Sequence, residues 1–182
     1  MDPRTDFTGA SPNQVELKAF EHLTAQELYG ILQLRAEVFV VEQNCSYLDL
    51  DGVDLYPETV HAVVHGAGSP APYHDSHGGE TGLTVKPRGY ARVLPYGLID
   101  GPAGDPEGRS IGRVVCDRRE RSTGIASALI SRLVDEFGDG LLTLNAQAHL
   151  RDFYGRFGFR QSGDPFIEDG IPHLPMRRIP GR

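Results

Sequence analysis

Tryptophan is absent from this 182-residue chain, and cysteine and methionine occur only twice each. Two cysteines are too few to staple a small secreted scaffold, so a hydrophobic core must hold the chain together. No apolar run reaches the roughly 18 residues that a membrane-spanning helix needs. The start, MDPRTDFTGASPN, lacks the basic and apolar segments of a secretory signal. These absences predict a cytoplasmic protein with no membrane partner.

Positive charge is scarce as well. The chain has 18 lysines and arginines against 25 aspartates and glutamates, which gives a formal net charge of −7. A field of that sign repels phosphate backbones, so we predict no nucleic-acid partner and favour cationic small molecules. Hydrophobic residues make up 39% and charged residues 24% of the chain, as in globular proteins. The length suits one domain.

The first half of the sequence predicts a polar start followed by mixed elements. Residues 1–14 are expected to form a flexible leader, and the domain spans 15–182. We predict a strand at 15–20, a helix at 25–38 opened by a capping box of Thr24 and Glu27, and strands at 59–65, about 81–86 and 89–95. The glycine, proline and histidine of 66–80 have little to bury, which predicts a mobile insert.

The second half is more regular. Strands are predicted at 110–116 and 141–146, and a helix at 148–157 followed by Gly158. Between the two strands, residues 122–137 carry apolar side chains on one face at helical spacing: Ile125, Ala126, Leu129, Ile130, Leu133, Val134 and Phe137. A last strand at 172–178 is weakened by Pro172 and Pro175.

The turn between the 110–116 strand and the long helix favours anion binding. It has the pattern Arg121-x-x-Gly124-x-Ala126, beside two more arginines at 118 and 119. A helix start has free backbone amides with partial positive charge, and glycine lets a ligand approach them closely. The alternative is an ordinary helix start with a solvated arginine cluster. Neither of the glycine patterns typical of ATP and dinucleotide sites is present.

The order of motifs resembles a known acetyl-CoA module. Arg121-x-x-Gly124-x-Ala126 opens a helix, the next strand ends in Asn145, and the following helix carries Phe153-Tyr154. This order resembles the GNAT superfamily of N-acetyltransferases, and the segments VFVVEQNCSYLDLDGVD, AQAHLRDFYGRFGF and EDGIPHLPM resemble its ElaA-like branch, over about residues 20–178. The resemblance implies an α/β (α+β) fold: a single domain with a central, mixed, mostly antiparallel twisted sheet flanked by helices. Two splayed strands would form the acetyl-CoA cleft, and a homodimer is possible.

The resemblance also implies roles for particular residues. Those implied to bind the cosubstrate acetyl-CoA are Val114, Val115, Cys116, Arg121, Ser122, Thr123, Gly124, Ile125, Ala126, Asn145 and Tyr154. The Val115 amide would polarise the thioester carbonyl. Tyr154 would be the general acid that assists the leaving thiolate. From spacing alone, Tyr154 could equally be a core residue with its hydroxyl at the edge.

The acceptor side is less defined. An amine must be neutral to attack, so a base is needed. Candidates for this base or for substrate contacts are Glu42, Glu37, the acidic loop with Asp49, Asp51 and Asp54, and the histidines His61 and His173. The alternatives are a solvated acidic loop and ordinary buried histidines.

Other chemistry is not favoured. His74 and His77, with His61 and His65 upstream, could suggest a metal. Structural zinc usually recruits closely paired cysteines and histidines, however, and His74 and His77 lie in the predicted mobile insert, so we predict none. Cys45 and Cys116 are expected to be small buried residues rather than nucleophiles. The sequence therefore predicts acetyl transfer from acetyl-CoA to a primary amine of a small molecule or peptide. The alternatives are a non-catalytic CoA-binding sensor or partner module, and an adaptor that binds no CoA.

Overall fold

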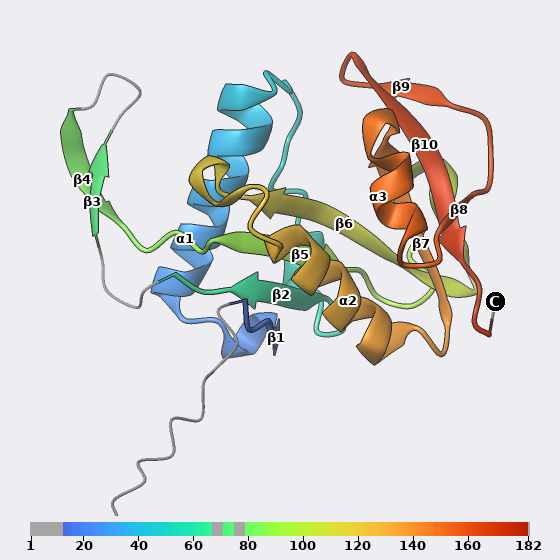
Figure 1. The fold of residues 1–182 in the computed structure, drawn as a ribbon. Helices are drawn as coiled ribbons and strands as arrows, with labels where there is room; N and C mark the ends of the chain where they lie inside the picture. The colour runs from blue at the N-terminus through green and yellow to red at the C-terminus, as the bar shows by residue number, and fades with distance from the viewer. Residues whose placement is uncertain (1–12, 67–70, 75–78, 182) are drawn as a thin grey trace, which may run out of the picture.

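A mixed eight-stranded sheet forms the centre of the protein (Figure 1). The computed structural model describes residues 13–66, 71–74 and 79–181. The strand order is β1-β2-β5-β6-β7-β10-β8, with β9 paired to β10. Its strands are β1 (Glu16–Ala19), β2 (Val60–Val64), β5 (Gly89–Val93), β6 (Gly108–Cys116), β7 (Leu141–Gln147), β8 (Arg160–Gln161), β9 (Phe166–Glu168) and β10 (Ile171–Arg178). Only β6 and β7 pair in parallel, so the predicted mostly antiparallel sheet is confirmed.

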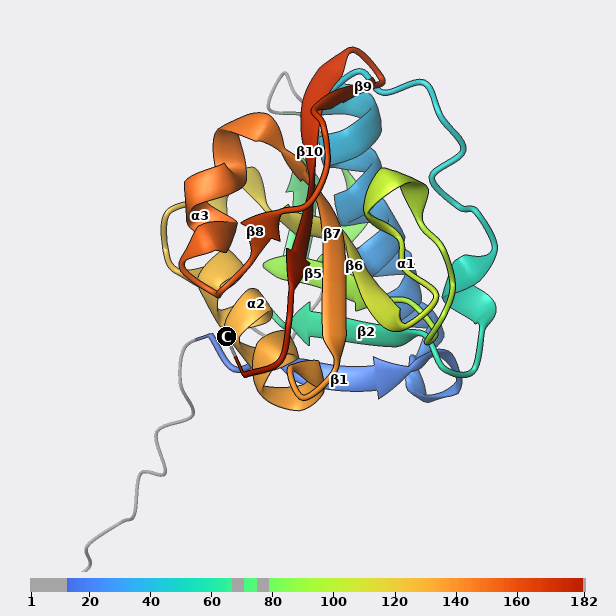
Figure 2. The same cartoon turned by 90° about the vertical axis from the view of Figure 1, so that its right-hand side faces the viewer.

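Helices cover both faces of this sheet. Figure 2 shows α1 (Ala25–Arg35) on one side, and α2 (Ile125–Phe137) and α3 (Arg151–Gly155) on the other. Helix α1 continues into a π-helix, η2 (Ala36–Glu42). The short 3-10 helices are η1 (Phe20–His22), η3 (Val53–Leu55), η4 (Gly101–Ala103), η5 (Arg118–Glu120) and η6 (Ala148–Leu150). No helix among the described residues is long and apolar enough to cross a bilayer.

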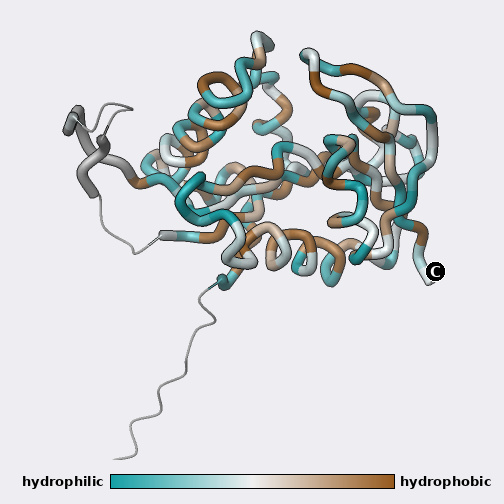
Figure 3. The backbone as a smooth tube through the Cα atoms, turned by 45° about the horizontal axis from the view of Figure 1, so that its top comes forward, coloured by the Kyte–Doolittle hydropathy of each residue, from teal (hydrophilic) through white to brown (hydrophobic). Residues whose placement is uncertain are grey.

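The core follows from the alternation of side chains along each strand. In β2, Ala62 and Val64 belong to the cluster under α2, whereas Val63 belongs to the cluster under α1. Helix α2 buries the stripe that its sequence predicts, and hydrophobic and hydrophilic segments alternate along both long helices in Figure 3. At Gly89 the helix lies so close that an added Cβ would meet Ile125 at 2.3 Å. This contact fixes where α2 starts over the sheet.

The helix starts show one confirmed signal and one correction. The capping box is present, since Thr24 Oγ1 accepts from the Glu27 amide at 3.1 Å and Glu27 Oε2 accepts from the Thr24 amide at 2.8 Å. The helix expected from 122, however, begins at Ile125, because Ser122 and Gly124 are both left-handed, with φ of 64° and 89°. A left-handed residue cannot continue a right-handed helix.

The insert at 66–80 contains structure that the composition did not predict. Residues 71–74 form β3 (Ala71–His74), which pairs with β4 (Glu80–Thr84) as a separate two-stranded sheet. Positions 67–70 and 75–78 lie outside the described residues, as does 1–12 of the expected leader.

Strand β10 forms in spite of its two prolines. The Pro175 carbonyl accepts from the Ser162 amide at 2.8 Å. In an antiparallel strand the nitrogen and carbonyl of one residue point to the same side, so the Pro175 nitrogen faces away from β7. Its missing N–H therefore removes nothing from the β7 ladder.

Candidate active site

A cleft opens where the two parallel strands stop pairing. Strands β6 and β7 are in register at three positions, ending at Ser110 and Thr143, whose hydroxyls lie 2.8 Å apart. Both strands continue beyond this point, and β7 runs across the direction of β5 and β6 in Figure 1. The space between them is a cleft of about 740 Å³, lined by Val114 and Cys116 from one strand and Gln147 from the other. The sheet thus has the opening that the resemblance implied.

A β-bulge bends β6 beside this cleft. Tyr90 pairs with Val115 and Arg92 with Gly112, so β6 has one residue more than β5 over this stretch. Arg113 takes up the extra residue with a φ of 53°, unusual for a residue other than glycine. Its guanidinium donates to Asp49 Oδ1 at 2.7 Å, which holds the bulge in place.

The N-terminus of α2 lies at one end of the cleft. Gly124 is its N-cap and supplies no side chain to satisfy the first amides. Ser122, Gly124, Ile125 and Ala126 line the cleft, whereas Thr123 is not among the described lining residues. The Thr123 hydroxyl instead donates to the Glu120 carbonyl at 2.6 Å. This end of the cleft offers backbone donors and the positive end of a helix dipole.

Arg121 is held by a carboxylate rather than standing free. Its two terminal nitrogens donate to both oxygens of Glu42, at 2.6 and 2.7 Å. The hydrogen bond from Arg121 lowers the pKa of Glu42 below its ordinary value. Glu42 is therefore ionised and paired with the Arg121 guanidinium, which argues against its expected role as general base.

Two further cationic or ionisable side chains line the cleft. Arg156 stands 5.3 Å from the centre of the Phe153 ring, and His149 projects from η6. Arg156 belongs to the Arg156-Phe157-Gly158-Phe159 ending that carried the family resemblance. Its place in that motif is the sequence signal that could have predicted Arg156 as a ligand contact.

A second cavity, of about 310 Å³, adjoins the cleft. Six residues line both spaces: Phe39, Gln43, Val114, Gln147, Leu150 and Tyr154. Tyr154 is 6% exposed, and burial raises the pKa of its hydroxyl well above the ordinary range. The phenol therefore keeps its proton at neutral pH at the junction of the two spaces.

Asn145 lines the second cavity, and its side chain holds a loop. Its Oδ1 accepts from the Ala103 amide at 3.1 Å, and its Nδ2 donates to the Asp100 carbonyl at 3.0 Å. Both ends of the amide are thus engaged by η4 and the residue before it. The amide still has one N–H and one oxygen lone pair for the expected bond to pantetheine.

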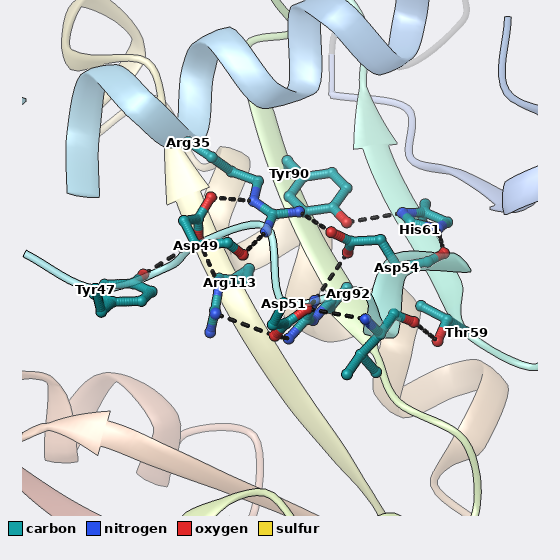
Figure 4. A network of polar contacts seen from close by, with 11 residues as sticks. Arg35, Tyr47, Asp49, Asp51, Asp54, Thr59, His61, Tyr90, Arg92 and Arg113 are labelled. Carbon is teal, nitrogen blue, oxygen red and sulfur yellow. Dashed lines mark hydrogen bonds and ion pairs between the residues drawn. The ribbon is translucent and has the colours of Figure 1, made fainter. Parts of the chain in front are cut away.

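The acidic loop is not a free anionic surface. It belongs to an ion network of three arginines and three aspartates, Arg35, Arg92, Arg113, Asp49, Asp51 and Asp54 (Figure 4). Burial alone would raise the pKa of Asp51, but hydrogen bonds and charge from Arg92 outweigh it and lower this pKa to about 2. The structure argues against the expected role of Asp51 in substrate binding, since its carboxylate is paired with Arg92 and Arg113 and lines neither described cavity.

Two other candidates for the acceptor side lie elsewhere. His61 is 1% exposed and lines neither described cavity. Its Nε2 faces the Asp54 carbonyl at 3.2 Å and must donate to it, so Nδ1 accepts from the Tyr90 hydroxyl at 2.8 Å. Glu37 also lies away from both described cavities and binds the Lys86 ammonium at 2.5 Å. Only His173, of the two histidines, lines the second cavity.

Of the four histidines weighed for a metal, the structure describes the side chains of His61 and His65. His77 lies outside the described residues. His65 instead meets Glu16 and Glu27, with ligand atoms within 4.8 Å of one another. The Lys18 ammonium bonds to Glu27 at 2.5 Å, so a cation already occupies these carboxylates.

Comparisons with known proteins identify the family. Residues 97–179 match the model of the acetyltransferase (GNAT) domain. The UPF0039 protein Rv2851c of Mycobacterium tuberculosis is 38% identical over 86% of both chains, and protein ElaA of Escherichia coli K12 is 36% identical over 86% of this chain and 90% of its own. The chain belongs to the GNAT superfamily, in its ElaA-like branch. This GNAT fold superposes on an acyl-CoA N-acyltransferase from Pseudomonas aeruginosa with a TM-score of 0.70, at 35% identity over 91% of this chain and 99% of that one.

The structure of E. coli ElaA is similarly close, with a TM-score of 0.69 and 32% identity over 91% of this chain and 98% of that one. GNAT membership thus applies to nearly the whole chain and not only to the half that the domain model matches. It supports an acyltransferase activity, for which the cleft and the second cavity are candidate binding spaces.

Proposed function

We propose that this GNAT protein transfers the acetyl group of acetyl-CoA directly to a primary amine of a small molecule or peptide. The observation that carries the proposal is that Tyr154, a protonated phenol, lies where the cleft and the second cavity meet. Acetyl-CoA would enter the cleft, and the amine would enter the second cavity. The two would then meet beside a proton donor.

The cleft fits the parts of acetyl-CoA. The diphosphate would lie on the free amides of α2, close to Arg121 and Arg156. The pantetheine arm would add to the unpaired edge of β6 at Val114, Val115 and Cys116, and the thioester would reach the junction. Because Glu42 holds Arg121 through both terminal nitrogens, a diphosphate would have to compete with that carboxylate.

The chemistry needs three contributions from the chain. Bringing amine and thioester together supplies most of the rate enhancement. The Val115 amide, expected to stabilise the oxyanion of the tetrahedral intermediate, faces β5 in the register with Tyr90 and would have to leave that ladder to do so. Tyr154 would donate a hydrogen bond to the departing sulfur. Collapse of the intermediate then gives free CoA and the new amide.

The test separates binding from catalysis. Tyr154→Phe should lower kcat about 100-fold and leave the dissociation constant for CoA unchanged, because the phenol acts only on the leaving group. Arg121→Glu should weaken CoA binding about 10-fold or more, measured by calorimetry. Arg132→Glu is the matched control, since Arg132 lies on the exposed face of the same helix beside Glu136.

A CoA sensor without activity would give a different pattern. Acetyl-CoA would raise the melting temperature, but no amine in a panel would release free thiol. An unchanged kcat in Tyr154→Phe would remove this residue from the reaction. Wild-type CoA affinity in Arg121→Glu would contradict the diphosphate position.

A further inference from the structure

The second cavity contains a histidine whose tautomer is fixed by its surroundings. His173 is 8% exposed, and its Nδ1 lies 2.9 Å from the carbonyl of Ile171. A carbonyl can only accept a hydrogen bond, so Nδ1 carries the proton. The neutral ring therefore presents an unprotonated Nε2, the nitrogen that can take up a proton.

The ring and its charge partner are both held by the β9–β10 hairpin. Phe166 pairs with His173 across the hairpin, and the two rings stack with centroids 5.7 Å apart. Glu168, on the same hairpin, places Oε2 4.0 Å from Nε2. That distance places the carboxylate within ion-pair reach of Nε2.

His173 is also one side chain away from the junction. On the other side of β10 it stands directly opposite Gln147. Residues opposite each other in a ladder have their Cβ atoms about 5 Å apart on the same face. Gln147 lines both cavities and donates to Gln43 at 3.2 Å, so the histidine lies next to the place where amine and thioester would meet.

The other candidates that the sequence offered for the general base are already engaged or lie away from the cavity. Glu42 is bound to Arg121, the three aspartates of the ion network are bound to arginines, and Tyr47 keeps its proton because burial raises its pKa to about 12. The charged or titratable groups that face His173 around the second cavity are Asp100, Glu168, Asp169, Arg113, Cys45, Tyr47 and Tyr154. Of the groups that the sequence proposed for the acceptor side, His173 alone combines a free basic atom with this cavity.

We propose that His173 Nε2 is the general base that deprotonates the acceptor, and that Glu168 is its positioning residue. The acceptor class is then a strongly basic primary amine, which arrives as an ammonium ion among the carboxylates of the second cavity. This inference rests on the proposed function, because it assigns the proton path of that same reaction.

The proton and bond changes balance as follows. The ammonium gives one proton to Nε2, and the neutral nitrogen then forms a bond to the thioester carbonyl carbon. The C–S bond breaks as the intermediate collapses, and the CoA sulfur receives a proton through Tyr154. The amide nitrogen loses its second proton, which restores Tyr154, and His173 releases its own proton to water.

The experiment compares two amines and four variants. His173→Gln is assayed at pH 7 with a strongly basic alkylamine and with a weakly basic amine that is already neutral at that pH. We expect kcat to fall about 100-fold with the first amine and less than about threefold with the second. His22→Gln is the matched control, because His22 is exposed beside Glu21 and lies away from both described cavities.

The pH profile and the third variant test the charge partner. The acid limb of kcat/KM with the alkylamine should disappear in His173→Gln. In Glu168→Gln it should move to lower pH, because the imidazolium loses its counter-charge. Added imidazole should restore part of the activity of His173→Gly, which a purely structural role would not allow.

Three results would overturn the assignment. These are wild-type kcat in His173→Gln, an equal loss with both amines, and an unmoved acid limb in Glu168→Gln. If His173→Gln does not fold, the Glu168→Gln profile decides alone. Failure of the proposed function looks different, since wild-type protein would then release no thiol with either amine.

Discussion

Two groups of carboxylates lie near the second cavity, and they differ in what holds them. Asp49, Asp51 and Asp54 each bond to arginines, and Asp49 and Asp54 are also buried. Glu168 and Asp169 are exposed, and within the described residues neither forms an ion pair with a lysine or arginine. Carboxylates that arginines hold stabilise the fold, whereas carboxylates without such partners remain available to a cationic ligand. Acidity in the sequence does not distinguish the two groups.

Arg92→Ala should have the largest effect. Arg92 is 1% exposed and bonds to both Asp51 and Asp54 at 2.9 Å. Its loss removes one of the two arginine partners from each aspartate and leaves the buried Asp54 undercompensated, so the free energy of unfolding should fall by about 3–5 kcal/mol in urea titrations. Arg132→Ala, which breaks an exposed pair with Glu136, should cost less than about 0.5 kcal/mol. Equal losses of unfolding free energy in the two variants would contradict the claim that the arginines of the ion network stabilise the fold more than an exposed ion pair does.

The ion network should be stable at neutral pH and weaken only in acid. The pKa of Asp51 is lowered from 3.8 to about 2, so its stabilising contribution is complete above about pH 4 and is lost as pH falls towards 2. Solvent screens this exposed carboxylate, so the expected loss is on the order of 1 kcal/mol, measured by urea unfolding at a series of pH values. Asp51→Asn should flatten this dependence, and an unchanged slope would contradict the assignment.

The Glu42–Arg121 pair tests whether an ion pair with arginine contributes to stability when both side chains are exposed. Its pair with Arg121 is exposed on both sides, at 37% and 41%, so it should contribute less than about 1 kcal/mol to stability. Glu42→Gln frees Arg121, and we expect CoA to bind about two- to fivefold more tightly by calorimetry. Weaker binding would mean that Glu42 itself supports the ligand.

Asp169→Asn should have the smallest effect on stability. Asp169 has a φ of 47°, a conformation that asparagine also tolerates, so the free energy of unfolding should stay within about 0.5 kcal/mol of wild type. The KM for the alkylamine should rise about two- to threefold, because one carboxylate of the cavity is lost. Asp164→Asn, in the nearby exposed loop, should change neither quantity.

Local sequence signals predicted the elements that they govern. The Thr24–Glu27 box marked the start of α1, and the apolar stripe of α2 and the motif order located the cleft. Contacts between distant segments could not be read in this way. The partners in the ion network are separated by 14 to 64 residues, so the loop around Asp51 read as a free acidic surface.

Backbone conformation was the second source of error. The bulge at Arg113 requires a positive φ, which glycine or asparagine would have signalled and arginine does not. Strands β8 and β9, of two and three residues, are too short for an alternating pattern. Since β9 carries Glu168 beside His173, the charge partner of the proposed base was hidden for the same reason.

The early end of the β6–β7 ladder has a consequence for handling the protein. Beyond Ser110, β6 and β7 no longer pair, which leaves a seam between the two strands. The amides and carbonyls along this seam resemble those of an edge strand, a common template for intermolecular pairing. A pantetheine chain laid along that seam would occupy the template. Protein stored with CoA should therefore aggregate less than protein from which CoA has been removed by dialysis.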